Sequence, residues 1–113
     1  MSGITTHVLD TTQGRPAAGV GVTLSVRVAD SWTELTRAAT GADGRVPDLL
    51  PAQAPAAPGT TYRLRFEIGA YYAAQGIATF YPAIEVMFTR QDDRHDHVPL
   101  LVSPFGYSTY RGT

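Results

Sequence analysis

The sequence contains no cysteine and no lysine. Without cysteine the chain forms no disulfide and offers no thiolate as a nucleophile or metal ligand. Because all nine basic residues are arginine, Schiff-base chemistry and a P-loop lysine are excluded as well. The missing cysteines also suit a reducing compartment.

Runs of positive charge and long apolar runs are missing too. The net charge is −1, and no basic cluster marks nucleic acid as the main partner. No apolar stretch approaches the roughly 20 residues of a membrane span. The segment Met1–Thr5 has neither the basic nor the apolar region of a signal peptide, so we expect a cytoplasmic protein without membrane contact.

What the chain does contain is alternation of apolar and polar residues, in a length of 113 residues that favours one domain, residues 1–113. Period-two alternation predicts half-buried strands. Four prolines predict a surface loop over residues 47–59. A short helix is expected over residues 70–75, ended by Gly76. The expected strands are residues 4–9, 20–29, 32–38, 45–46, 62–68, 84–89, 98–102 and 107–111.

These elements predict an all-β fold, an antiparallel two-sheet sandwich of seven or eight strands with one short helix. Residues 32–38 have a weaker pattern and are expected at an edge. Residues 98–102 are apolar on both parities, so we expect this strand to be covered on both faces, one of them by another subunit.

Two histidines stand two residues apart near the C-terminus, which places His95 and His97 on one side of a strand. Such a pair is one way to hold a metal ion, although two rings do not complete a tetrahedral site. The alternative is one solvated and one structural histidine. Asp96 points to the opposite side, and Asp92 and Asp93 are expected in a turn.

The third histidine, His7, shares its strand face with Thr5 and Leu9. Taken alone it is a core histidine bonded to backbone. Arg45 follows an Asp-Gly turn, and its pattern alone indicates a solvated charge.

The last residues are aromatic and polar, unlike a frayed terminus. Arg111 is either a buried anchor, paired with a carboxylate such as Glu67 or Asp10, or a substrate clamp. Tyr110 is a hydroxyl donor or a packing residue, and the carboxylate of Thr113 is able to orient a histidine. No nucleophile elbow, H-E-x-x-H, phosphate loop or dinucleotide fingerprint accompanies them.

The tail Tyr110-Arg111-Gly112-Thr113 closely resembles the Tyr-Arg-Gly-Ser ending of the 5-hydroxyisourate hydrolases, the transthyretin-like enzymes of urate breakdown. The resemblance covers almost the whole chain. Its further segments are Thr6-His7-Val8-Leu9-Asp10, Gly14-Arg15-Pro16-Ala17, Asp43-Gly44-Arg45, Tyr62-Arg63-Leu64-Arg65-Phe66, Phe80-Tyr81-Pro82 and His97-Val98-Pro99-Leu100-Leu101.

The resemblance implies a prealbumin-like sandwich that assembles as a homotetramer, with active sites in the channel between dimers. It implies hydrolysis of 5-hydroxyisourate to 2-oxo-4-hydroxy-4-carboxy-5-ureidoimidazoline, without cofactor or metal. The catalytic residues that it implies are His7, Arg45, His97 and Thr113. The substrate-binding residues that it implies are His7, Arg45, Tyr110 and Arg111.

Two other functions stay open beside this hypothesis. A transthyretin-like carrier binds a small ligand without turnover, but transthyretin lacks the Tyr-Arg-Gly-Ser ending and the histidine and arginine set. A metal enzyme would use His7, His95 and His97. The chain departs from the hydrolase pattern at Thr113, where threonine replaces the terminal serine and keeps its hydroxyl, so we expect activity to be retained.

Overall fold

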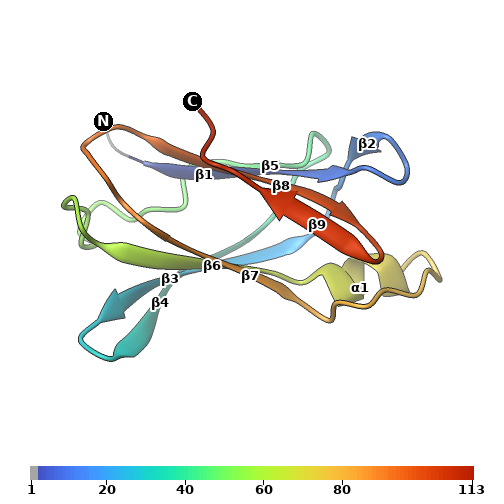
Figure 1. Ribbon diagram of the computed structural model, residues 1–113, viewed down its shortest axis with the longest axis horizontal. Helices are drawn as coiled ribbons and strands as arrows, with labels where there is room; N and C mark the ends of the chain where they lie inside the picture. The colour runs from blue at the N-terminus through green and yellow to red at the C-terminus, as the bar shows by residue number, and fades with distance from the viewer. Residues whose placement is uncertain (1–2) are drawn as a thin grey trace.

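Two β-sheets pack face to face, with one short helix at one end of the sandwich, in a computed structural model that describes residues 3–113 (Figure 1). One sheet has the order β2-β1-β8-β9, with β5 also paired to β1, and the other has the order β4-β3-β6-β7. The first sheet consists of β1 (Ile4–Asp10), β2 (Arg15–Pro16), β5 (Arg45–Val46), β8 (Asp96–Ser103) and β9 (Gly106–Thr109). The second consists of β3 (Gly21–Val28), β4 (Ser31–Ala39), β6 (Thr61–Phe66) and β7 (Ile84–Thr89).

Alternate residues of the strands fill the space between the sheets. In β1 the even-numbered residues are buried and the odd-numbered ones are half-buried on the outer face, as the period-two pattern predicts. The core side chains of β1, β3, β6 and β8 include Ile4, Val8, Val22, Leu24, Val26, Tyr62, Leu64, Phe66, Leu100 and Val102. The predicted sandwich, with β4 at an edge, is confirmed.

One pairing in the first sheet differs from the prediction. Strands β1 and β8 run parallel, from Ile4 opposite Asp96 to Asp10 opposite Val102, so the expectation of a purely antiparallel sandwich was wrong here. Alternation indicates which face a residue occupies but not the direction of its strand. A parallel pair needs a long crossover, and the whole second sheet lies between these two strands in the chain.

Element boundaries also differ from the prediction. Helix α1 is Ile68–Ala73, two residues earlier than expected, because Ile68 and Tyr72 lie one turn apart and are both buried under the sheets. Strand β9 ends at Thr109 rather than at residue 111, and the two-residue β2 was not predicted. Residues 47–59 form neither helix nor strand, as their prolines predicted. Within residues 3–113 no helix is long and apolar enough to cross a membrane.

A buried ion pair fastens the start of β8. Arg90 is 1% exposed, and its Nε lies 3.1 Å from Oδ2 of Asp96. The same guanidinium donates hydrogen bonds to the carbonyl of Gly3 at 3.1 Å and to that of Ala56 at 3.3 Å. Three segments distant in the chain are therefore held at one buried cation.

Replacing Arg90 with methionine is expected to lower the free energy of unfolding by about 3–5 kcal/mol, because Asp96 then stays buried without its partner. Urea denaturation followed by circular dichroism measures the change. Arg94→Met is the matched control, since Arg94 is exposed and pairs with Asp92 at the surface, and it is expected to change stability by less than about 1 kcal/mol. Equal midpoints for the two variants would contradict this role of Arg90.

Candidate active site

The candidate site lies on the outer face of the first sheet, where three strands meet. Strand β1 pairs with β5 on one side and with β8 on the other. The register sets His7 opposite Arg45 and Thr5 opposite His97. Residues directly opposite in paired strands point to the same face. Two histidines and one arginine from distant parts of the sequence therefore lie side by side.

His7 is oriented by the turn that precedes β5. Its Nε2 lies 2.9 Å from the carbonyl oxygen of Asp43. Because a carbonyl only accepts, Nε2 carries a proton, and Nδ1 makes no hydrogen bond to the residues that the structure describes. The Oδ1 atom of Asp43 accepts a hydrogen bond from the backbone N–H of Arg45 at 3.0 Å. Asp43, which the sequence indicated only as a turn residue, thus positions both His7 and Arg45.

The turn itself requires glycine at Gly44. Its φ is +77°, and a Cβ there would lie 2.5 Å from the backbone oxygen of Val8. A side chain would push the turn away from β1. Gly44 therefore allows the close approach that places Arg45 beside His7.

His97 is half-buried, and a threonine hydroxyl binds its ring. The Oγ1 of Thr5 lies 2.8 Å from Nδ1 of His97 and also 2.8 Å from Nε2 of His95. The alternation in the sequence placed Thr5 only on the same strand face as His7. Its histidine partners can be identified only from the β1–β8 register.

The pKa of the His97 imidazole lies below its ordinary value of 6.5. Burial is the main cause, because it penalises the charged ring. The nearby guanidinium of Arg45 lowers the pKa further, followed by His7 and His95. His97 is therefore neutral at pH 7 and able to accept a proton, beside a permanent positive charge on Arg45.

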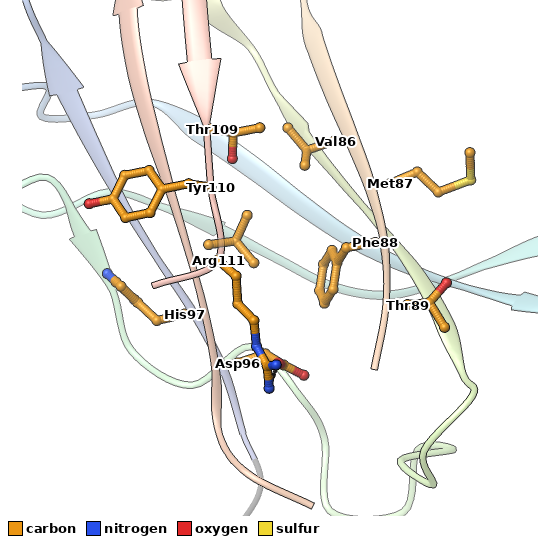
Figure 2. A pocket seen from close by; sticks show the side chains of 10 residues that line it. Val86, Met87, Phe88, Thr89, Asp96, His97, Thr109, Tyr110 and Arg111 are labelled. Carbon is orange, nitrogen blue, oxygen red and sulfur yellow. Dashed lines mark ion pairs between the residues drawn. The ribbon is translucent and has the colours of Figure 1, made fainter. Parts of the chain in front are cut away.

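The tail crosses His97 at close range. The N–H of Gly112 donates to the carbonyl of His97 at 2.7 Å. A Cβ on Gly112 would lie 2.7 Å from Cδ2 of the His97 ring, so only glycine fits there. Figure 2 shows the rings of Tyr110 and His97 on the same side of the tail. Tyr110 is exposed, and so is Thr113, which follows the contact.

Arg111 extends in a different direction from Tyr110. Its Nη2 lies 3.3 Å from both carboxylate oxygens of Asp92. It also lies 3.7 Å from Oδ1 of Asp96, toward which Figure 2 shows the side chain pointing. Its side chain is 40% exposed and pairs with Asp92, so the first of the two alternatives, a buried anchor paired with Glu67 or Asp10, was wrong. Within this chain its guanidinium fastens the tail and does not join the histidines.

The surroundings of the histidines are open rather than pocket-like. A cleft of about 220 Å³ lies between β7 and the tail, and its lining includes Phe88, His97, Tyr110 and Arg111 (Figure 2). Arg45 and Thr5 line a separate open groove. Among residues 3–113 no group of three or more histidine or carboxylate side chains is placed to hold a metal ion. The three-histidine metal site considered from the sequence does not form there.

Comparisons with known proteins identify the family of this chain. The model of the HIUase/Transthyretin family matches residues 4–112. The chain belongs to the HIUase/transthyretin family. A 5-hydroxyisourate hydrolase of Caulobacter vibrioides is 46% identical over 118 residues, with both chains covered completely. Among solved structures, the 5-hydroxyisourate hydrolase of Klebsiella pneumoniae is 36% identical, with a TM-score of 0.85 over 99% of this chain and all of that one.

Backbone similarity does not separate the two branches of this family. Sea bream transthyretin in complex with thyroxine is 33% identical, and covers 97% of this chain and 94% of its own with a TM-score of 0.88. That score is as high as the score of the hydrolase. Whether the protein hydrolyses its ligand or only carries it must therefore be judged from the side chains on the outer face of the first sheet.

Replacing Arg45 with methionine is expected to raise the pKa of His97 toward 6.5, because a positive charge that disfavours the imidazolium is removed. The value should stay below 6.5, since burial remains. Titration of the ring protons by NMR measures it. Arg15→Met, an exposed arginine of the same sheet, is the control and should leave the His97 pKa unchanged. An unchanged pKa in the Arg45 variant would refute the electrostatic contact.

Proposed function

We propose that this protein hydrolyses 5-hydroxyisourate, opening its six-membered ring to 2-oxo-4-hydroxy-4-carboxy-5-ureidoimidazoline. One observation carries the proposal: a half-buried His97 with a lowered pKa shares one sheet face with His7 and Arg45. A neutral imidazole beside a fixed cation suits hydrolysis at a carbonyl. Relatives that are named 5-hydroxyisourate hydrolase and match the full length of the chain support the same substrate.

His97 is the general base in this proposal. Its Nε2, the ring nitrogen opposite the Thr5 contact, takes a proton from water as the water oxygen bonds to the ring carbonyl carbon. The ring C–N bond then breaks, leaving a carboxylate and a ureido nitrogen. Positioned base catalysis contributes about 10²–10⁴-fold. Arg45 stabilises the developing oxyanion, and the free Nδ1 of His7 accepts a hydrogen bond from a substrate N–H.

The tail has a binding and positioning role in the proposed reaction. Tyr110 is exposed on the His97 side and contacts the substrate. Arg111 acts through Asp92, which keeps the tail against His97, rather than through the substrate contact that the resemblance implied. The hydroxyl or the carboxylate of Thr113 orients the attacking water. No step in this scheme requires a cofactor.

The proposed site is completed by further copies of the chain. Small-molecule sites enclose most of their ligand, whereas this cluster lies on an open sheet face. The same face carries the half-buried Leu9 and Leu101 and the exposed Tyr110. We therefore propose a homotetramer with active sites at the interface between dimers. Because the cysteine-free sequence suits a reducing compartment, we place this enzyme in the cytoplasm.

The ultraviolet absorbance decay of freshly generated 5-hydroxyisourate tests the activity. The native protein should accelerate the decay over buffer, and His97→Asn should lower the rate by about 10²–10⁴-fold because the base is lost. The exposed Arg37 on the other sheet provides the control, Arg37→Met, which should keep native turnover. Decay no faster than buffer, from a protein that binds the substrate stoichiometrically, would instead favour a carrier.

Sedimentation velocity tests the assembly. The native protein should sediment as four copies, and Leu101→Arg should dissociate it because a charge would be buried at the interface. Val28→Arg places the same charge at an exposed position of the second sheet and should leave the tetramer intact. An active native monomer would overturn the proposed interface site.

A further inference from the structure

One side chain on the outer face connects His97 to solvent. The hydroxyl of Thr5 lies within hydrogen-bond distance of two ring nitrogens, Nδ1 of His97 and Nε2 of His95, each at 2.8 Å. Thr5 and His97 are half-buried, whereas His95 is exposed. These two hydrogen bonds form a continuous relay from the half-buried ring of His97, through Thr5, to His95 and bulk water.

When both rings are neutral, this relay has only two possible arrangements of its protons, called here its first and second states. A hydroxyl has one proton to donate, and each neutral imidazole carries one N–H. In the first state, Nδ1–H of His97 donates to Thr5, and Thr5 donates to Nε2 of His95. In the second state, Nε2–H of His95 donates to Thr5, and Thr5 donates to Nδ1 of His97. Only the first state leaves Nε2 of His97 free to accept a proton from water.

The reaction proposed above also needs an outlet for one proton. Hydrolysis of the ring amide at neutral pH gives a carboxylate, an uncharged ureido NH₂ group and one proton that is released to solvent. Of the two protons of the attacking water, one goes to the leaving nitrogen and the other must leave the site. Two groups near His97 are poorer outlets: Arg45 on β5 is a permanent cation, and in the proposed site Nδ1 of His7 is bonded to the substrate while its Nε2 proton is bonded to Asp43.

We propose that Thr5 is a positioning residue that keeps the His97 proton on Nδ1, and that the Thr5 hydroxyl passes the reaction's proton to His95. This inference rests on the proposed function. As Nε2 of His97 takes a proton from water, Nδ1–H of His97 moves to the Thr5 oxygen. The hydroxyl proton of Thr5 moves to Nε2 of His95. His95 then loses its Nδ1 proton to bulk water, and the relay is left in its second state.

The remaining proton of the attacking water goes to the leaving nitrogen as the C–N bond breaks. After the product leaves, Nε2 of His97 gives its proton to water in the emptied site and Nδ1 of His95 takes one proton from bulk water, which returns the relay to its first state. Every proton is accounted for, and no further reactant is needed.

The lowered pKa of His97 is consistent with this direction of transfer. Burial and the neighbouring cation make His97 a poor place to retain a positive charge. The exposed His95 is better solvated, so a proton that reaches it exchanges with water. The distance of each step is that of an ordinary hydrogen bond.

Thr5→Val tests the positioning role, since valine keeps the shape and removes the hydroxyl, and Thr5→Ser is the conservative rescue. Ring ¹⁵N NMR should show the His97 proton on Nδ1 in the native protein and in Thr5→Ser, and a shift toward Nε2 in Thr5→Val. Turnover of 5-hydroxyisourate should give a kcat about tenfold lower for Thr5→Val, with KM unchanged and full recovery in Thr5→Ser. Thr11→Val is the control, because Thr11 directly follows the same strand and its hydroxyl binds the carbonyl of Val102, away from the histidines.

His95→Gln tests the outlet. The glutamine Oε1 takes the place of Nε2 as an acceptor, so the Nδ1 proton of His97 should be kept, but glutamine cannot release a proton. We expect a kcat about tenfold lower in dilute buffer, restored by added imidazole. Native kcat in this variant, without dependence on imidazole, would overturn the outlet through His95.

The NMR result separates this inference from the proposed function. If the native protein does not accelerate the reaction, the proposed function fails, and the tautomer of His97 still reports on Thr5. If the native protein is active but Thr5→Val keeps both the Nδ1 proton and native kcat, the proposed function stands and the role of Thr5 is overturned.

Discussion

The parallel contact between β1 and β8 is the constraint on which the candidate site depends. It places Thr5 beside His97, while the opposite edge of β1 sets His7 beside Arg45. A shift of one residue in this register would turn the reactive side chains of one strand into the core. The apolar residues of the inner face hold the register, because Val8 and Leu100 lie opposite each other and are fully buried. Packing in the core thus determines geometry on the outer face.

The electrostatics of the face follow from the same placement. His97 is half-buried between strands and next to Arg45, so the charged form of its ring is disfavoured from two directions. The tail adds a third constraint, because Gly112 lies directly on the ring edge and bonds to the backbone of His97. The base is therefore held neutral by burial and charge and held still by the tail, and it has no ionic partner among residues 3–113. Near pH 7 the ring is thus in the unprotonated form in which a general base acts.

Local patterns in the sequence predicted most strands and placed Thr5, His7 and Leu9 on one face of β1, but they did not predict that this face is the outer one: taken alone, His7 was expected in the core. They did not predict that β1 and β8 run parallel, because alternation carries no information on strand direction. The resemblance supplied His7, Arg45 and His97 as one set. Thr5 and Asp43 escaped notice because their roles depend on contacts across the register and on a turn carbonyl, which single residue types do not indicate. The carboxylate that Arg111 binds could not be identified for the same reason: Asp92 lies in a loop, and the sequence left open whether Arg111 is an anchor or a substrate clamp.

The span of chain between the two halves of the site has a consequence for folding. The contact between Thr5 and His97 joins positions 92 residues apart, and the whole second sheet lies between them. Proteins dominated by such distant pairings fold slowly, because loop-closure entropy must be overcome before the contact forms. Hairpins such as β3–β4 can form without this contact, but the candidate active site exists only once β1 and β8 have paired. A partly folded chain in which β1 and β8 are not yet paired therefore has strands but no site.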